Sequence, residues 1–489
     1  MKTFLSKTQF TRGLQCHKSL WLCRHRPDLR SAPDAAAQAR FDAGREVGIV
    51  AQELFPDGAL IEFDRSEFKE KIRATKAAME RRTRTIYEAT FSHDGVLVMV
   101  DMLHKGARGW EIYEVKSTTQ VKEHHIPDAA VQYYVLKGEG VRISRVSIVH
   151  LNNAYVREGE IKVKDLFHIE DVTGQTQDLQ DFVREQVRLQ QSMLEGGKPA
   201  IDIGPQCSDP YVCDFIDVCW HHIPEDSVFD LKERGVDKFF LYRNGIIRQR
   251  DIPLDVLNPR QRFQVESTLK KQNYISKERI KEFLACLRYP LCYLDFETVA
   301  TAIPLYNGSK PYQQVPFQYS IFVQKRKGSQ LEHFEHLAEP GKDPREELLK
   351  GLLEVVPEGA CTVAYNAAFE QRVLTDLAER YARHRGKINR IVDNFVDLMQ
   401  PFKNRHIYHW QMKGSYSLKQ VLPALVPTMT YDGLEISDGC MAGQAYLDMG
   451  RTRDPEERKR IRKALLAYCK QDTHGMAEIV KKMRLLSGA

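Results

Sequence analysis

The sequence predicts an α/β protein of more than one domain. Short apolar segments with strand character, such as 96–103 and 290–299, alternate along the chain with longer segments of helical periodicity. The 489 residues, 42% hydrophobic and 28% charged, have the composition of ordinary globular domains, and the length favours about two to four of them. No apolar run has signal-peptide or membrane-spanning length, so we expect a cytoplasmic protein without a membrane partner.

The first elements of the chain are a helix and a pair of strands. Ser6 begins the helix, Gln9 completes a capping box, and Cys16 falls near the carboxyl end. Residues 96–103 and 110–116 are predicted as strands joined by the polar turn 104–109. A short helix over 128–138 follows, with Gly138 at its end.

Acidic and basic side chains gather on these strands. Glu114 and Lys116 are two residues apart and share a strand face, while Asp101 lies on the neighbouring strand. Gln132, on the helix that follows, is within reach of the same place. Asp101 and Glu114 would hold a divalent metal, and Lys116 would orient water or offset charge on a phosphate. A surface salt bridge is the commoner fate of such charges and is the alternative.

The ten cysteines are unevenly distributed. Cys207, Cys213 and Cys219 recur every six residues in a turn-rich segment, which indicates a soft-metal site that needs a fourth ligand. A zinc site with three cysteines and a histidine competes with an iron–sulfur cluster, and three unliganded thiols are the plain alternative. The candidates for the fourth ligand are Cys16, Cys23, His221 and His222.

Residues 226–288 are predicted to form a helical connector between two domains. Prolines at 253, 259 and 290 give it strong boundaries. The segment 234–246 has a faint likeness to a helix-hairpin-helix element that binds DNA backbone. Because the hairpin glycines are incomplete, we favour a simple spacer.

After the connector, a buried strand carries two acids side by side. Asp295 and Glu297 share one face, because residues i and i+2 of a strand project together. Two carboxylates forced together repel each other unless a cation neutralises them, and Mg²⁺ and Mn²⁺ prefer carboxylate oxygens. An edge strand with two solvated acids is the alternative.

Two further acids follow on other predicted elements. Glu370 lies near the start of a helix after the apolar segment 363–366, and Asp472 lies on a long helix that begins after Asp454. Tyr468 precedes Asp472 by four residues and shares its helix face. The four acids can meet at a two-metal site in which Tyr468 orients the attacking water. Asp397 is interpreted as structural.

The C-terminal third resembles the DnaQ-like, or DEDD, 3′–5′ exonucleases of the ribonuclease H-like fold. Residues 295–298 match the first motif with its D-x-E spacing. Asn366 to Glu370 matches the second motif, N-x-x-F-D, with glutamate in place of aspartate, and Tyr468 to Asp472 matches the third, Y-x-x-x-D. The resemblance implies an exonuclease domain over 289–489, with Mg²⁺ or Mn²⁺ held by the four acids.

The N-terminal part resembles the PD-(D/E)XK nucleases, in particular the RecB-like branch that includes CRISPR-associated iron–sulfur nucleases. The match consists of Asp101, then Glu114-x-Lys116, then Gln132. It implies a restriction-endonuclease-like domain over 1–225. It also implies a [4Fe-4S] cluster that closes the domain, with Cys23 as a bystander. The four implied cluster ligands are Cys16, Cys207, Cys213 and Cys219.

One position departs from this branch. Gly48 stands where related nucleases often carry a histidine ligand, so Glu46 or Gln52 would supply the third metal ligand, or the site is one ligand short. The loop 306–314, with Tyr312, would either contact a nucleic-acid end or form a plain hairpin.

Together, the two resemblances imply a bacterial-type fusion of two nucleases acting on nucleic acid, DNA in the first place. The N-terminal site would cut and the C-terminal site would trim from a 3′ end. Three alternatives remain: an RNA-directed exonuclease, a nucleic-acid-binding scaffold with degenerate sites, and a zinc-stabilised N-terminal domain. The net charge of +6 permits such partners without arguing for them.

Overall fold

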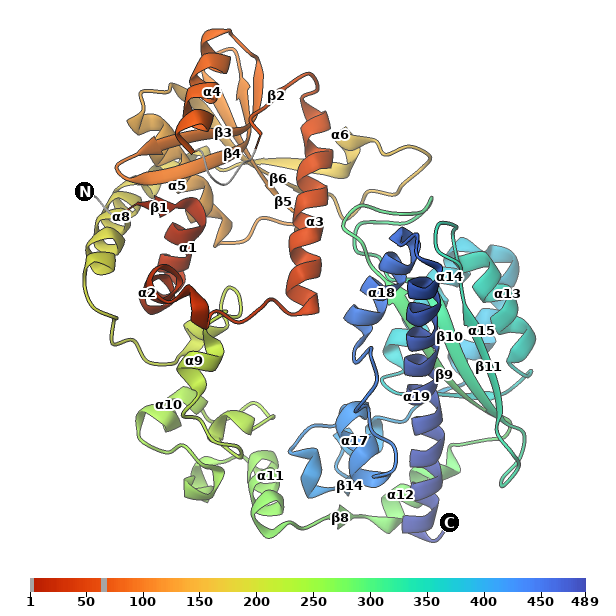
Figure 1. Cartoon of the computed structure of the whole chain (residues 1–489). Helices are drawn as coiled ribbons and strands as arrows, with labels where there is room; N and C mark the ends of the chain where they lie inside the picture. The colour runs from red at the N-terminus through yellow and green to blue at the C-terminus, as the bar shows by residue number, and fades with distance from the viewer. Residues whose placement is uncertain (1–3, 63–67) are drawn as a thin grey trace. The chain divides into compact units, whose positions relative to one another are not determined.

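Helices and strands are mixed throughout the chain, which confirms the predicted α/β class. The computed structural model describes residues 4–62 and 68–489 (Figure 1). The chain divides into two units. Unit 1 contains the residues up to His222 together with Thr301–Tyr312, and unit 2 contains Ile223–Ala300 and Gln313–Ala489. The predicted connector, 226–288, therefore groups with unit 2.

A seven-stranded mixed sheet forms the centre of unit 1. Its order is β2-β3-β4-β5-β6-β7, with β1 pairing alongside β4. β3, β4 and β5 are antiparallel neighbours, β5 and β6 are parallel, and β6 and β7 are antiparallel. The strands are β1 (Leu5–Ser6), β2 (Ala59–Leu60), β3 (Thr85–His93), β4 (Val96–Lys105), β5 (Trp110–Lys116), β6 (Ile143–Leu151) and β7 (Phe167–Asp171).

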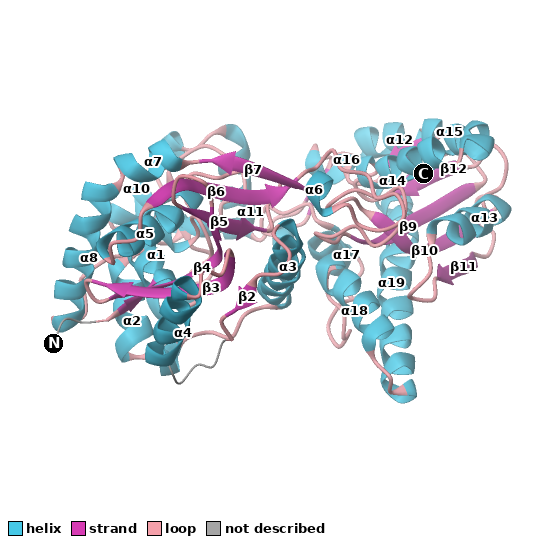
Figure 2. Cartoon of the chain, turned by 90° about the horizontal axis from the view of Figure 1, so that it is seen from above, coloured by secondary structure: helices cyan, strands magenta, loops and turns pink. Residues whose placement is uncertain are grey.

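Helices cover both faces of this sheet (Figure 2). On one face, apolar side chains of α5 and α8 pack with Ile112 and Ile148 in the larger core. On the other face, Val47 of α3 packs with Tyr113 and Val149. The α-helices of unit 1 are α1 (Lys7–Gln15), α2 (His17–His25), α3 (Ala35–Ala51), α4 (Phe68–Glu80), α5 (His125–Gly138), α6 (Val163–Leu166), α7 (Thr173–Asp178), α8 (Gln180–Glu195) and α9 (Ile216–Trp220).

The local predictions for unit 1 agree closely with its structure. Ser6 caps α1 through a capping box: its hydroxyl accepts from the Gln9 amide at 3.2 Å, and the Gln9 side chain accepts from the Ser6 amide at 2.9 Å. The predicted strand over 110–116 is confirmed as β5, and β4 extends two residues beyond the prediction. α5 ends at Gly138 as predicted but begins three residues earlier, at His125.

Unit 2 is built on a five-stranded sheet of order β11-β10-β9-β12-β13. β9 is central, antiparallel to β10 and parallel to β12, so it is buried on both edges. The strands are β9 (Leu291–Val299), β10 (Val315–Gln324), β11 (Glu332–Leu337), β12 (Cys361–Ala364) and β13 (Phe395–Asp397), with β8 (Tyr274–Ile275) and β14 (Ile407–Tyr408) in a separate pair.

The long helix α19 begins as predicted and packs along the sheet of unit 2 (Figure 1). The Asp454 side chain caps it by accepting from the Glu456 amide at 3.0 Å. α18 approaches β9 closely, since a Cβ on Gly443 would lie 3.2 Å from the Thr298 carbonyl oxygen. The α-helices are α10 (Lys238–Arg243), α11 (Pro259–Lys270), α12 (Lys277–Ala285), α13 (Arg345–Val355), α14 (Ala368–Arg380), α15 (Arg385–Asp393), α16 (Gln400–Lys403), α17 (Leu418–Leu425), α18 (Gly439–Arg451) and α19 (Pro455–Ser487).

Residues 301–312 leave unit 2 at the end of β9 and pack within unit 1. Ala302 and Ile303 are buried in the apolar cluster that contains Val47. The Arg157 guanidinium donates to the carbonyl oxygens of Pro304 at 2.9 Å and Leu305 at 2.8 Å. Part of the loop expected to meet nucleic acid or form a plain hairpin is therefore a structural part of unit 1.

None of the described helices combines the length and apolar character that crossing a membrane demands.

The anchoring of residues 301–312 generates a first prediction. Hydrogen bonds from a charged group stabilise the bound conformation by about 1.5–3 kcal/mol. Arg157→Ala should therefore increase the population of the open, cleavable segment, and with it the rate of chymotryptic cleavage within 301–312, at least about tenfold. Limited proteolysis followed by mass spectrometry measures this rate. Arg108→Ala, in the exposed turn between β4 and β5, is the matched control. Equal cleavage rates in the two variants would contradict the anchoring role.

Candidate metal centres

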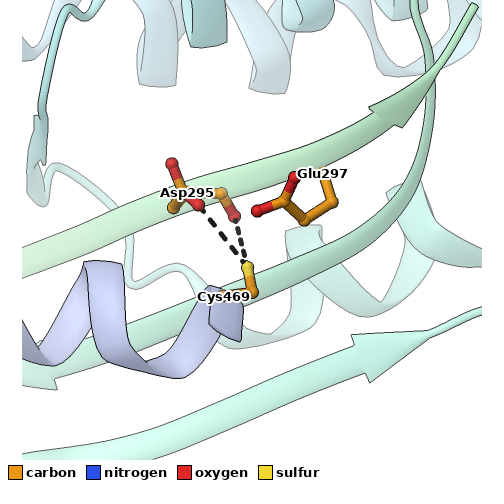
Figure 3. A group of neighbouring side chains, drawn as sticks. All are labelled: Asp295, Glu297 and Cys469. Atoms are coloured by element: carbon orange, nitrogen blue, oxygen red, sulfur yellow. Dashed lines mark hydrogen bonds between the residues drawn. The ribbon is translucent and has the colours of Figure 1, made fainter. Parts of the chain in front are cut away.

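The second half of β9 presents two carboxylates to α19. Asp295 and Glu297 project on the same side of the strand, as their spacing predicted, and Cys469 of α19 faces them (Figure 3). The Cys469 Sγ lies 3.6 Å from Asp295 Oδ2 and 3.8 Å from the Asp295 carbonyl oxygen. One ligand atom from each of the three residues lies within 4.8 Å of the others. The side chains of Glu297 and Cys469 are buried.

Two other elements bring the remaining predicted acids close. Asp472 lies one turn beyond Tyr468 on α19 and is 8% exposed, and Glu370 lies in the first turn of α14 and is 2% exposed. β12 runs parallel to β9 and ends at Ala364, one residue beyond the pair of Val363 with Tyr293, so the turn after β12 delivers α14 close to Asp295. That turn contains Asn366 at a φ of +68°. Asp397 accepts from the Asn366 amide at 3.0 Å and so holds the turn.

The electrostatics show that these carboxylates crowd together. Burial raises the pKa values of Asp295 and Glu297 well above the usual range, and the Asp472 charge is the next cause for both. Burial raises the pKa of Glu370 to about 8, with Asp397 and Asp472 adding to it. Burial also raises the pKa of Asp472, to about 6, although Tyr431 and Lys419 favour its charged form.

Tyr431 and Lys419 were missed by the sequence argument. The Tyr431 hydroxyl donates to Asp472 Oδ1, and the Lys419 Nζ lies 5.6 Å from the centre of the Tyr468 ring. Burial and the Asp472 charge raise the pKa values of both tyrosines, so both phenols stay protonated as donors. Tyr431 and Lys419 lie outside the three recognised motifs, and only the folding of α17 and its neighbours against α19 brings them to the acids.

The predicted N-terminal residues also come together. Glu114 is buried, and its carboxylate accepts from Lys116 Nζ at 2.7 Å and from Gln132 Nε2 at 2.6 Å. Asp101 Oδ2 accepts from the Val115 amide at 2.7 Å. β4, β5 and α5 thus bring Asp101, Glu114, Lys116 and Gln132 to one site.

Lys7 and Asp128 complete this N-terminal group and were not predicted. Lys7 Nζ, on the first turn of α1, lies 2.7 Å from Glu114 Oε1 and 3.7 Å from Asp128 Oδ1. Asp128, on α5, also accepts from Lys116. Lys7 is 107 residues from Glu114 in sequence, so no local pattern connects them.

The charges of this group oppose one another. Burial raises the pKa of Asp101 to about 8, and the neighbouring Glu114 adds to the effect. Burial also acts to raise the pKa of Glu114, but Lys116 and Lys7 outweigh it and hold that pKa below its usual range. Glu114 therefore carries its charge against two lysines, whereas Asp101 is the acid that gains most from an added cation.

α3 carries the positions considered for a third ligand. Glu46 is exposed, and its charge acts on Tyr312, whose hydroxyl donates to the Ser117 carbonyl oxygen. Val47, the next residue, packs on the sheet face opposite α5. A Cβ on Gly48 would meet nothing within 4 Å. The assignment of Glu46 or Gln52 as a ligand stays a prediction.

The four predicted cluster cysteines line a single cavity. Cys16 lies at the junction of α1 and α2, and Cys219 lies on α9. Burial raises the pKa of both thiols, and nearby cluster cysteines add to the effect in each case. The remaining two, Cys207 and Cys213, also contribute to the cavity wall.

The alternative ligands are less well placed. Cys23 is not among the residues that line the cavity. His221 is exposed, and its Nδ1 lies 2.8 Å from the Val218 carbonyl oxygen. The four-cysteine set therefore fits the cavity better than a set that includes Cys23 or His221.

Polar contacts tie the N-terminal helices to the cysteine-rich segment. The Arg12 guanidinium forms two hydrogen bonds to the Asp214 carboxylate, at 2.5 and 2.9 Å. The Gln15 amide donates to the carbonyl oxygens of Gln206 at 2.8 Å and Tyr211 at 2.7 Å. The start of unit 1 and the segment that follows α8 are thus held together around the cavity.

Comparison with known proteins identifies relatives without a described activity. Residues 292–417 match a family described as "Domain of unknown function (DUF2779)". The chain is 24% identical over 236 residues to uncharacterized protein MG366 of Mycoplasma genitalium, covering 45% of this chain and 35% of that protein. It is 25% identical over 229 residues to uncharacterized protein UU173 of Ureaplasma parvum, covering 41% and 33%. The chain spans about a third of the length of these relatives.

The raised pKa values generate a prediction about the metal-free protein. An acid whose pKa is higher in the folded than in the unfolded state binds protons more readily when folded, so stability falls as pH rises between the two values. For Glu370 this window extends from about 4.5 to about 8. One such group changes the free energy of unfolding by at most about 1.4 kcal/mol per pH unit. Calorimetry of chelator-treated protein should show a transition temperature that falls from pH 5 to pH 8.

Added Mg²⁺ should oppose this fall, because a cation favours the charged carboxylates. Glu370→Gln cannot titrate and should flatten the pH dependence of the metal-free protein. The exposed Glu379→Gln, on the same helix, is the control and should retain it. A transition temperature that rises across this window, or an unchanged slope in Glu370→Gln, would refute the linkage.

Proposed function

We propose that this chain is a metal-dependent nuclease with two hydrolytic sites. The observation that carries the proposal is the convergence of four largely buried carboxylates, from β9, α14 and α19, at one end of the unit 2 sheet. The strand order β11-β10-β9-β12-β13, with only β10 antiparallel to β9, supports a ribonuclease H-like fold. The three matched motifs fall on the elements that such an exonuclease site requires.

The chemistry of the donor set fits Mg²⁺ or Mn²⁺. Glu370 Oε2 is buried and has no hydrogen-bond partner among the described residues, as expected of an oxygen that would coordinate a metal ion. Asp295, Glu297, Glu370 and Asp472 would hold the ions, which when bound supply an activated water and stabilise the leaving oxygen. The added methylene of Glu370 changes the reach of one ligand but retains its charge.

Other residues of unit 2 have distinct roles in this proposal. The protonated Tyr468 hydroxyl would orient the attacking water, while Tyr431 fixes Asp472 by donating to its carboxylate. Lys419 would offset negative charge on the scissile phosphate. The substrate is a nucleic acid with a free 3′ end, with DNA as the first candidate.

The second proposed site is the N-terminal group of unit 1, interpreted as a PD-(D/E)XK centre. Asp101 and Glu114 would hold Mg²⁺ or Mn²⁺. The Gln132 amide donates to the Glu114 carboxylate at 2.6 Å and so fixes the orientation of this ligand. Lys116 would position the water or the phosphate. Lys7, which bonds the same Glu114 oxygen as Lys116, balances the charge of the site before the metal binds.

The cysteine cavity supports a structural [4Fe-4S] cluster in the same unit. A single tetrahedral zinc ion with Zn–S bonds of about 2.3 Å draws its thiolates within about 4 Å of one another. Among the described residues, Asp295, Glu297 and Cys469 form the one group of three metal-ligating side chains within 4.8 Å, so the four thiols are more widely spaced. That spacing favours a cluster over one zinc ion. Its role would be to join residue 16 to the segment that ends at residue 219.

Selective inactivation tests the two sites. Asp295→Ala combined with Glu297→Ala should reduce Mn²⁺-dependent release of nucleotides from a 3′-labelled DNA by at least about a hundredfold, because the metal ligands are lost. The same variant should retain the cleavage performed by unit 1. Lys116→Ala should give the reverse result. End-labelled single- and double-stranded DNA and RNA, with Mg²⁺ or Mn²⁺, identify the substrate.

Three outcomes would count against this assignment. Full 3′-directed trimming by the double variant would exclude the unit 2 site. Binding of DNA without any metal-dependent product would favour a scaffold with degenerate sites, the competing class. Cleavage restricted to RNA would move the proposal to an RNA-directed exonuclease.

The cluster is tested separately by iron and colour. Protein purified without oxygen should be brown and contain about four iron and four sulfide ions per chain, as thiolate-bound clusters do. Cys213→Ser should lose most of this iron, whereas Cys23→Ser, the matched control on α2, should retain it. A colourless, zinc-loaded wild type would overturn the cluster assignment.

A further inference from the structure

Glu88 lies in line with the two acids of the N-terminal site. In the antiparallel register, Tyr87 pairs with Met102 and Ala89 with Val100, so Glu88 lies opposite Asp101. On the other edge of β4, Met102 pairs with Tyr113. The next pair in this antiparallel register is Asp101 with Glu114, so these two acids also lie opposite each other. Directly opposed residues in adjacent strands project from the same face. Three acids therefore form a row across β3, β4 and β5.

The regular alternation of β3 breaks at this position. Ile86 and Ala89 both belong to the core cluster that contains α5, although residues three apart in a regular strand face opposite sides. Tyr87 belongs to the cluster on the other face. Glu88, between them, has a φ of +56°, which is strained for a residue with a side chain. The alternation of β3 therefore breaks between Tyr87 and Ala89, at Glu88.

The opposite strand has the same irregularity. Val100 and Leu103 both belong to the α5-side cluster, while Met102 belongs to the cluster on the other face. The break in β4 therefore falls at Asp101, opposite the break at Glu88. The two breaks thus fall at two facing acids, and of these Glu88 has the strained backbone conformation. Such strain is characteristic of functional positions.

The surroundings of Glu88 belong to the same site. Burial raises the pKa of the Glu88 carboxyl, Lys7 opposes that rise and Glu114 adds to it, so all three charges are close. Glu88 in turn contributes to the raised pKa of Asp101. Gln132 is fully buried, and its Oε1 has no hydrogen-bond partner among the described residues. Its Nε2 is bonded to Glu114, so this unsatisfied oxygen is within the same group.

We propose that Glu88 is the third carboxylate ligand of the N-terminal metal site, filling the role that Gly48 leaves open. This inference rests on the function proposed for that site. The positive φ at Glu88 is then strain of the kind found at functional positions, here in the residue of β3 that lies opposite Asp101. Three carboxylates would give the site a preference for hard divalent ions such as Mn²⁺.

Mn²⁺ binding by the full chain tests this role without depending on turnover. Asp295→Asn and Glu297→Gln together remove ligands from the unit 2 site, and electron paramagnetic resonance of free Mn²⁺ then measures binding to unit 1. In that background, Glu88→Gln should weaken Mn²⁺ affinity at least about tenfold, since even indirect partners of a metal ligand are worth that much. Glu88→Asp should restore part of the loss.

Two further variants separate ligation from strain and from general charge. Glu88→Gly relieves the positive φ and should melt at the same or a higher temperature than Glu88→Gln, yet bind Mn²⁺ equally poorly. Glu170→Gln is the control for general charge, because Glu170 is an exposed acid of β7 that lies in the same row, opposite Ile148. This variant should bind Mn²⁺ with the same affinity as the Asp295→Asn, Glu297→Gln protein.

The outcomes distinguish this inference from the function on which it rests. Unchanged Mn²⁺ affinity in Glu88→Gln, with affinity lost in Asp101→Asn, would overturn the role of Glu88 and leave the site intact. Unchanged affinity and cleavage in Asp101→Asn would instead overturn the N-terminal site. A loss in Glu88→Gln that Glu88→Gly reverses would show that strain, and not ligation, was responsible.

Discussion

Repulsion between buried carboxylates is the constraint on which both candidate centres depend. In unit 2, the sheet, α14 and α19 largely shield Asp295, Glu297, Glu370 and Asp472 from water, and burial raises the pKa of every one. Removing charged groups from water is costly unless a partner compensates. The tight packing that makes these acids unfavourable alone also makes them a strong ligand set for a divalent ion.

The two units meet this constraint differently. In unit 1, Lys7 and Lys116 contact Glu114 directly and hold its pKa low, whereas the pKa of Asp101 is raised. In unit 2, the phenol of Tyr431 bonds Asp472, and Lys419 is the cation that favours its charged form. In the N-terminal group, Glu114 is therefore already ionised before a metal binds. The C-terminal group releases protons when a cation enters.

Sequence reasoning succeeded where the chemistry is local. The spacing of Asp295 and Glu297 defines a strand face, and the Ser6 capping box defines where α1 begins. It failed where contacts cross long distances in sequence: Lys7 reaches Glu114 only because α1 packs near β4, and Tyr431 reaches Asp472 only through the fold of unit 2. Glu88 was missed because no strand was predicted from the sequence over 85–93, so nothing placed this acid opposite Asp101.

Residues 301–312 have a consequence for the order in which the protein folds during synthesis. Unit 1 buries Ala302 and Ile303 beside Val47, yet these residues are made only after the whole stretch 223–300 has been translated. At about 5–20 residues per second, this gap lasts on the order of ten seconds. Throughout it the nascent chain exposes an unfilled apolar surface around α3. The ribosome therefore releases a finished unit 1 only when β9, with both its acids, has also emerged.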